Sequence, residues 1–142
     1  MLLVIDVGNT NTVVGVYDGE VLVDNWRIRT EREKTADEWW ILFRDLFQVD
    51  HIDSRDFEGL IISSVVPPVS DMLQGMTKRY FHVTALIVGP EIETGMPIFY
   101  DNPAEVVADR IVNAVAAFER HKRSMIVVDF GTATTFDYIS PN

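Results

Sequence analysis

Two short segments each combine an aspartate, a glycine and several hydroxyl or amide side chains. They are Asp6-Val7-Gly8-Asn9-Thr10-Asn11-Thr12 and Asp129-Phe130-Gly131-Thr132-Ala133-Thr134-Thr135. Glycine lets the backbone turn tightly and approach a ligand, and successive backbone N–H groups in such a turn form a concave anion site. The aspartate cannot bind phosphate directly, because like charges repel, but it can hold a hydrated Mg²⁺ that bridges phosphates. The pair therefore predicts two phosphate-binding corners that face each other across a nucleotide.

Each corner follows an apolar run, at residues 2–5 and 125–128, and precedes strand-like sequence. An apolar run that ends in aspartate is typical of a buried strand that delivers a carboxylate to the edge of a sheet. For either copy alone, an ordinary β-hairpin with an Asx-type turn is the simpler interpretation. The repetition favours phosphate binding.

Composition excludes several classes of function. The chain has 142 residues, of which 47% are hydrophobic, a formal net charge of −10 and no cysteine. The acidic charge argues against a nucleic-acid or anionic-membrane partner, and the lack of cysteine excludes disulfides, thiolate zinc sites and a cysteine nucleophile. Because Asp6 interrupts the first apolar run, we expect neither a signal peptide nor a membrane span, and a cytoplasmic location. The scattered His51, His82 and His121 do not suggest a metal site.

The pattern of apolar and turn residues predicts an α/β chain. A hairpin turn is expected at Asp18-Gly19, and Thr35-Ala36-Asp37-Glu38 is a capping box that opens a helix whose aromatic stripe packs into the core. Strands are predicted over residues 2–6, 11–17, 20–29, 59–66 and 83–88, and further helices over 69–80 and 103–122. A strand, a turn and a second strand are predicted over 125–139. Three antiparallel strands followed by alternating helices and strands predict a mixed sheet flanked by helices.

The helix predicted to begin at Asn102-Pro103-Ala104-Glu105 carries candidate catalytic residues. Helical projection places Asp109 nearly opposite an apolar stripe, so it could face a cleft and accept a proton from a hydroxyl that attacks phosphorus. Arg110 could hold an anionic group of the substrate. On periodicity alone, a solvated helix face with weak surface ion pairs is favoured. The stripe consists of Val107, Ile111, Ala114, Val115 and Phe118.

The second corner lies too close to the end of the sequence to complete a domain. We expect a first domain over 1–123 and the truncated opening of a second over 124–142, because an isolated two-stranded hairpin is marginal in water. The remainder is expected to be missing, and this chain alone is expected to be inactive.

Taken together, these segments resemble the type III pantothenate kinase family, within the acetate and sugar kinase/Hsp70/actin superfamily. The resemblance extends over the whole chain. Besides the two corners it rests on Ser63-Ser64-Val65-Val66-Pro67-Pro68, Thr94-Gly95, Tyr100-Asp101-Asn102-Pro103 and Ala108-Asp109-Arg110-Ile111-Val112-Asn113-Ala114. It implies a ribonuclease H-like/actin-like ATPase domain, plus the first hairpin of a second similar domain. The implied activity is ATP-dependent phosphorylation of pantothenate to 4′-phosphopantothenate, the first step of coenzyme A biosynthesis, by a homodimer.

The resemblance also implies roles for individual residues. Asp109 would be the general base, Asp6 would act through Mg²⁺, and Asp129 would bind a monovalent cation, K⁺ or NH₄⁺. The ATP contacts would be Asp6, Val7, Gly8, Asn9, Thr10, Asn11, Thr12, Val13 and Thr132. The pantothenate contacts would be Tyr100, Val107, Ala108, Asp109 and Arg110.

The chain departs from the family in two respects. The family usually has glycine at the position of Val107, where valine adds bulk beside the substrate, although the helical projection places Val107 on the core stripe. The family's chains are also about twice as long. Two alternatives remain: a non-catalytic nucleotide-binding regulator of the same superfamily, which Val107 favours, and an actin-like assembly protein that polymerises with nucleotide.

Overall fold

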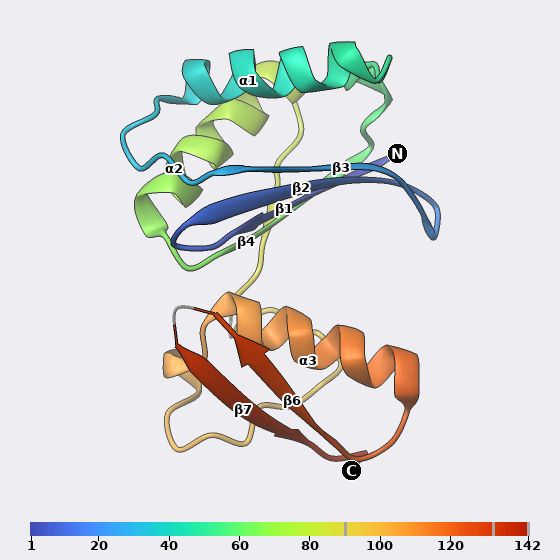
Figure 1. The fold of residues 1–142 in the computed structure, drawn as a ribbon, viewed down its shortest axis with the longest axis vertical. Coiled ribbons are helices and arrows are strands. Elements are labelled where there is room, and N and C mark those ends of the chain that lie inside the picture. Colours follow the sequence, from blue (N-terminus) through green and yellow to red (C-terminus); the bar gives the residue numbers. More distant parts are fainter. Residues whose placement is uncertain (90, 132, 142) are drawn as a thin grey trace. The chain divides into compact units, whose positions relative to one another are not determined.

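The computed structural model describes residues 1–89, 91–131 and 133–141, and the chain divides into two compact units (Figure 1). The first unit is Met1–Ile87 and the second is Val88–Asn142. The predicted domain limit between residues 123 and 124 falls inside the second unit, between a helix and a strand that pack together, and it stays a prediction.

A five-stranded mixed sheet forms the first unit. Its strands are β1 (Leu2–Val7), β2 (Asn11–Asp18), β3 (Val21–Arg29), β4 (Gly59–Ser64) and β5 (Leu86–Ile87), in the order β3-β2-β1-β4-β5. The first three pair antiparallel, and β4 and β5 run parallel to β1. The predicted mixed sheet with flanking helices is therefore confirmed.

Two strand boundaries differ from the sequence prediction. The β2–β3 turn lies one residue later than predicted, at Gly19 and Glu20, because Asp18 still pairs with Val21. Gly19 has a φ of +58°, which glycine adopts without steric cost. The predicted strand over 83–88 contributes only two residues to the sheet.

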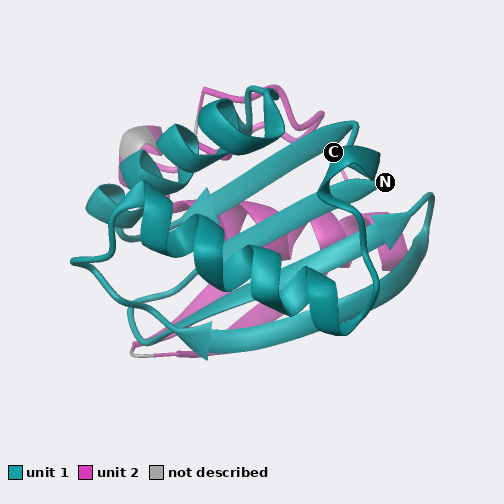
Figure 2. Cartoon of the chain, turned by 90° about the horizontal axis from the view of Figure 1, so that it is seen from above, with its two compact units in different colours: residues 1–87 teal, residues 88–142 magenta. Residues whose placement is uncertain are grey.

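The helices α1 (Ala36–Val49) and α2 (Pro67–Met76) both cover one face of this sheet (Figure 2). The predicted capping box is confirmed, because the Thr35 hydroxyl accepts from the Glu38 N–H and the Glu38 carboxylate accepts from the Thr35 N–H. Helix α2 begins two residues earlier than predicted, because proline is tolerated in the first turn of a helix. The remaining short helical turns of this unit are η1 (Ser54–Asp56) and η2 (Thr77–Phe81).

The core of the first unit lies between the sheet and these helices. Alternate residues of the central strands point into it, and all are fully buried or nearly so; they are Leu3, Ile5, Val7, Val14, Val16, Leu60 and Ile62. From α1, the rings of Trp39, Phe43 and Phe47 are buried against them. The aromatic stripe is thus core packing, as predicted.

The second unit contains η3 (Pro103–Glu105), helix α3 (Ala108–His121) and a hairpin of β6 (Met125–Phe130) and β7 (Thr134–Ile139). Helix α3 packs on one face of the hairpin (Figure 1). The other face exposes the large apolar side chains Ile126, Val128, Phe130, Phe136 and Tyr138. Among the described residues, the hairpin therefore buries one side only.

The predicted single helix over 103–122 is wrong at its beginning. The proline-led turn is a short 3₁₀ helix, and Val107 then adopts an extended conformation with φ −73° and ψ 157° as the N-cap of α3. The two segments do not share one helical phase, so the projection that placed Val107 on the core stripe fails. Val107 is 46% exposed, whereas Ala108 and Ile111 are buried.

None of the helices in the described part of the chain combines the length and the apolar character needed to cross a bilayer.

Phe47 packs among other aromatic side chains of the first unit. Its ring centroid lies 5.6 Å from that of Trp26, 6.0 Å from that of Phe43 and 5.2 Å from that of Phe57. We expect Phe47→Ala to lower the free energy of unfolding by about 3–5 kcal/mol, because it removes apolar contacts and leaves a cavity. Urea titration followed by tryptophan fluorescence measures this change. Ile41→Ala, on the exposed side of the same helix, is the control and should cost less than about 1 kcal/mol. A Phe47→Ala variant as stable as this control would contradict the packing account.

Candidate functional site

The first corner lies between β1 and β2, and its turn is closed by its own backbone. The Gly8 N–H donates to the Asn11 carbonyl oxygen at 2.9 Å. A Cβ added at Gly8 would lie 3.1 Å from that same oxygen, which is tighter than side chains normally approach. Glycine therefore suits this tight turn, but its N–H bonds within the turn itself.

Thr30, which directly follows β3, fixes this corner from outside. Its hydroxyl donates to the Gly8 carbonyl at 2.8 Å and lies 2.9 Å from the buried Thr12 hydroxyl, and its N–H donates to the Thr10 carbonyl at 2.9 Å. Sequence reasoning missed Thr30. The predicted pairing of residues 11–17 with 20–29 was the available signal. An antiparallel pair of these strands brings Thr30, which follows the second strand, beside Thr10, which precedes the first.

Asp6 reaches the exposed side of the corner, where its orientation is fixed by the neighbouring strand. Ser63 on β4 is its register partner, and the Ser63 hydroxyl donates to Asp6 Oδ1 at 3.0 Å. The Asp6 side chain is exposed, whereas Ser63 is buried. The central strand β1 and a buried hydroxyl thus present the predicted carboxylate where the strand ends.

The other residues of the first corner differ in what they can offer a ligand. Asn9, Thr10 and Asn11 are exposed, and Asn9 Oδ1 accepts from Arg32 Nη2 at 3.0 Å. The Thr12 side chain is fully buried, as is Val7, so a ligand contact from either must come through the backbone. Val13, opposite Asp6 in the register, is half-buried.

The second corner lies between β6 and β7 and repeats part of this arrangement. The Gly131 N–H donates to the Ala133 carbonyl at 3.2 Å. At the end of β6, Asp129 Oδ2 accepts from Asn113 Nδ2 of α3 at 3.2 Å. Thr135 is directly opposite Asp129 in the hairpin, and among the described residues its buried hydroxyl oxygen has no hydrogen-bond partner.

Thr132, the predicted nucleotide contact of the second corner, lies outside the described residues. The predicted meeting of the two corners across a nucleotide concerns the placement of the two units, and it stays a prediction.

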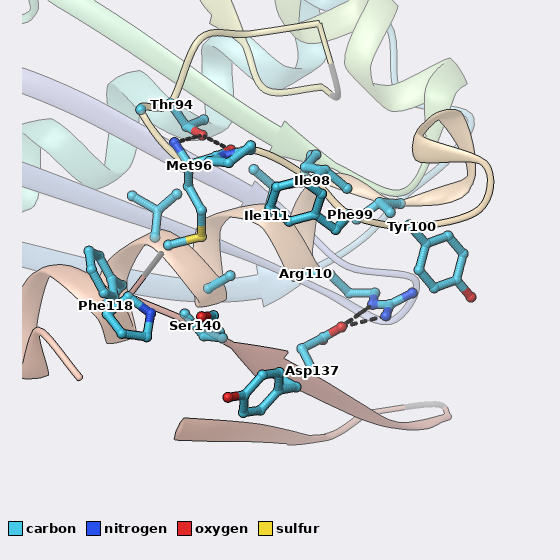
Figure 3. A pocket seen from close by; sticks show the side chains of 18 of the residues that line it. Thr94, Met96, Ile98, Phe99, Tyr100, Arg110, Ile111, Phe118, Asp137 and Ser140 are labelled. Carbon is cyan, nitrogen blue, oxygen red and sulfur yellow. Dashed lines mark hydrogen bonds and ion pairs between the residues drawn. The ribbon is translucent and has the colours of Figure 1, made fainter. Parts of the chain in front are cut away.

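Helix α3 carries the remaining candidates in its first turn. Asp109 is half-buried, and its Oδ1 accepts from the Arg110 N–H at 2.7 Å. Arg110 Nε donates to both carboxylate oxygens of Asp137 on β7, at 2.9 and 3.2 Å, and Nη2 donates to Oδ1 (Figure 3). The ring of Tyr100 lies 5.3 Å from the Arg110 guanidinium carbon. The hydrogen bonds that Arg110 donates to the Asp137 carboxylate raise the pKa of Arg110 above its usual range.

Arg110 and Tyr100 line a pocket of 620 Å³ within the second unit. Figure 3 shows apolar side chains along much of its wall and the Arg110–Asp137 pair at one side. The structure therefore brings Tyr100 and Arg110 together, as predicted. Asp109, Val107 and Ala108 are not among the described residues that line this pocket.

Asp137 was missed by the sequence analysis. Alternation along the last predicted strand was the available signal, because it places residues 135, 137 and 139 on the same face. A carboxylate on the inward face of the hairpin needs a partner, and Arg110 supplies it.

The family model described as type III pantothenate kinase matches residues 2–142. A type III pantothenate kinase from Syntrophus aciditrophicus is 64% identical over 141 residues, covering 99% of this chain and 56% of the relative. One from Myxococcus xanthus is 57% identical over 141 residues, covering 99% of this chain and 55% of the relative. The chain thus spans about half the length of the curated relatives it matches.

A solved structure supports the fold. It is a Porphyromonas gingivalis protein proposed to be an N-acetylglucosamine kinase, and it matches 99% of this chain and 45% of its own with a TM-score of 0.58. At 11% sequence identity, this likeness concerns the fold alone.

Replacing Thr30 tests whether this residue holds the first corner. Thr30→Val removes the hydroxyl while keeping the branched shape, so it leaves the Gly8 carbonyl and the buried Thr12 hydroxyl without their partner. We expect a loss of about 1–3 kcal/mol in the free energy of unfolding, measured by urea titration. Thr30→Ser keeps the hydroxyl and should lose much less. Equal stability of Thr30→Val and the unchanged chain would show that the corner does not depend on these bonds.

Proposed function

The chain belongs to the type III pantothenate kinase family, and we propose on this basis that its protein phosphorylates pantothenate to 4′-phosphopantothenate with ATP, in coenzyme A biosynthesis. The observation that carries the proposal is the family match over residues 2–142, which includes both corners and the start of α3. A homodimer in the cytoplasm is part of the same proposal, by likeness to the family.

ATP phosphates are proposed to bind the corner from Asp6 to Val13, with Thr132 as a further nucleotide contact. The exposed amides and hydroxyl of this corner can donate to phosphate oxygens. Asp6 fits Mg²⁺, because its carboxylate is exposed and oriented by Ser63, and carboxylate oxygens are preferred ligands of this ion. When bound, the ion neutralises charge on the phosphates.

Asp129 is proposed to bind the monovalent cation, K⁺ or NH₄⁺. The site fits a cation that takes oxygen ligands, because the buried Thr135 hydroxyl oxygen opposite Asp129 has no partner among the described residues. An unsatisfied buried oxygen is costly, and a cation or an ammonium group would satisfy it. Asn113 orients the Asp129 carboxylate from the other side.

Pantothenate is proposed to contact Tyr100 and the segment Val107 to Arg110. Asp109 would accept the proton of the primary hydroxyl as that oxygen attacks the γ-phosphorus. The bond from the Arg110 N–H holds the Asp109 carboxylate in one orientation. Catalysis would then consist mainly of positioning and charge neutralisation.

The exposed Val107 bears on the alternative of a nucleotide-binding regulator. Because Val107 is accessible at the head of α3, its bulk lies on surface that a ligand could approach, where the family usually has glycine. The relatives at 55–64% identity nevertheless carry the name of the enzyme, so this alternative is not favoured. No feature of the described residues favours an actin-like assembly protein.

The full-length protein distinguishes the kinase from the regulator. We expect ATP consumption in a coupled assay only when pantothenate is present, with a product heavier by one phosphoryl group in mass spectrometry. ATP turnover that does not depend on pantothenate, or no turnover, would overturn the proposal.

Asp109→Asn tests the general base. In the full-length protein we expect kcat to fall roughly 10²–10⁴-fold, the usual contribution of a positioned base, because an amide cannot accept the hydroxyl proton. Glu119→Gln, an exposed acid on the same helix, is the matched control and should keep its turnover. Near-normal kcat in Asp109→Asn, by the same coupled assay, would remove Asp109 from the mechanism.

A further inference from the structure

Arg110 is held on two sides within the second unit. Asp137 binds the edge of the guanidinium that carries Nε and Nη2, and the guanidinium carbon lies over the Tyr100 ring, 5.3 Å from its centroid (Figure 3). The pair is largely shielded from solvent, since the side chains of Arg110 and Asp137 are 19% and 18% exposed. A two-point pair between planar groups fixes direction as well as distance.

The pair also changes what Arg110 can recognise. A guanidinium beside a carboxylate has little net charge to offer a second anion, whereas its remaining N–H groups keep their donor capacity. The bonds to Asp137 use the Nε–H and one N–H of Nη2, so the second N–H of Nη2 and both N–H groups of Nη1 are not taken up by Asp137. Arg110 thus differs from an arginine without such a partner, whose full charge could hold an anionic group of the substrate.

We infer that Asp137 is a positioning residue for substrate binding: it fixes Arg110 in the pocket wall so that Arg110 donates to a neutral oxygen, a hydroxyl or amide carbonyl, of the substrate. This inference rests on the proposed function. It assigns to β7 a part in binding pantothenate, and it assigns recognition of the substrate's carboxylate to other groups.

Two other roles of Asp137 predict different effects on the KM for pantothenate. If Asp137 instead competed with the substrate's carboxylate for Arg110, removing the Asp137 charge would strengthen pantothenate binding. If the pair only stabilised the fold, removing it would lower the melting temperature without a selective effect on the KM of one substrate.

The experiment compares Asp137→Asn with the unchanged full-length protein, using pantothenate and its primary amide, pantothenamide, in which a neutral group of nearly the same size replaces the carboxylate. We expect KM to rise roughly 10–100-fold for both compounds by the same factor, as expected for a lost charge-assisted contact. The KM for ATP should stay within about twofold. Asp137→Glu, which keeps the charge, should recover part of the loss.

Two results would overturn the inference. One is a KM for pantothenate that is unchanged or lower in Asp137→Asn. The other is a rise for pantothenate but not for the pantothenamide, which would show that Arg110 reads the carboxylate. Glu119→Gln serves as a control, because it breaks an exposed ion pair of the same helix.

A double variant keeps the test decisive if Asp137→Asn alone folds poorly. Arg110→Gln with Asp137→Asn replaces the ion pair by two neutral amides. Since Asp137 acts through Arg110, the double variant should have the KM of Arg110→Gln alone, whereas independent roles would multiply the two effects. Failure of the unchanged protein to turn over pantothenate would refute the proposed function, a result distinct from turnover with an unaffected KM in the variants.

Discussion

The pairing of β1 with β2 on one side and β4 on the other is the constraint on which the first corner depends. Its register sets Asp6 beside Ser63 and Val13, and it buries Ile5 and Val7 on the opposite face. Side chains alternate along a strand, so a slip of one residue would bury the carboxylate and expose two core residues. The apolar core therefore fixes the position of the charged group, and a small set of hydroxyl bonds completes its orientation.

The second unit applies the same rule to a smaller sheet. In the hairpin register Asp129 and Asp137 share the face that packs on α3, and the helix supplies one partner to each, Asn113 and Arg110. A partly buried carboxylate without a partner would be costly, so these bonds help to hold the helix on the hairpin. The proposed cation site and the proposed substrate contact are thus neighbours on one small scaffold.

Local signals in the sequence predicted most of the fold. Apolar runs, a two-residue turn and the Thr35 capping box located the strands and α1, because each depends on residues close together in the chain. Val107 escaped prediction because the choice between one continuous helix and a 3₁₀ turn followed by a new helix is settled by packing. The roles of Thr30 and Asp137 depend on neighbours 22 and 27 residues away in sequence. The first neighbour follows from the register of β2 and β3, and the second from the packing of α3 on the hairpin.

The claim that Asp6 holds a phosphate-bound magnesium ion is tested most directly by calorimetry of ATP binding to the full-length protein, with Mg²⁺ and with EDTA. The account predicts that EDTA weakens binding about tenfold or more in the unchanged protein. It also predicts that Asp6→Asn binds ATP equally weakly under both conditions, because the amide is a poor ligand for this ion. Full magnesium dependence and full affinity in Asp6→Asn would contradict the account.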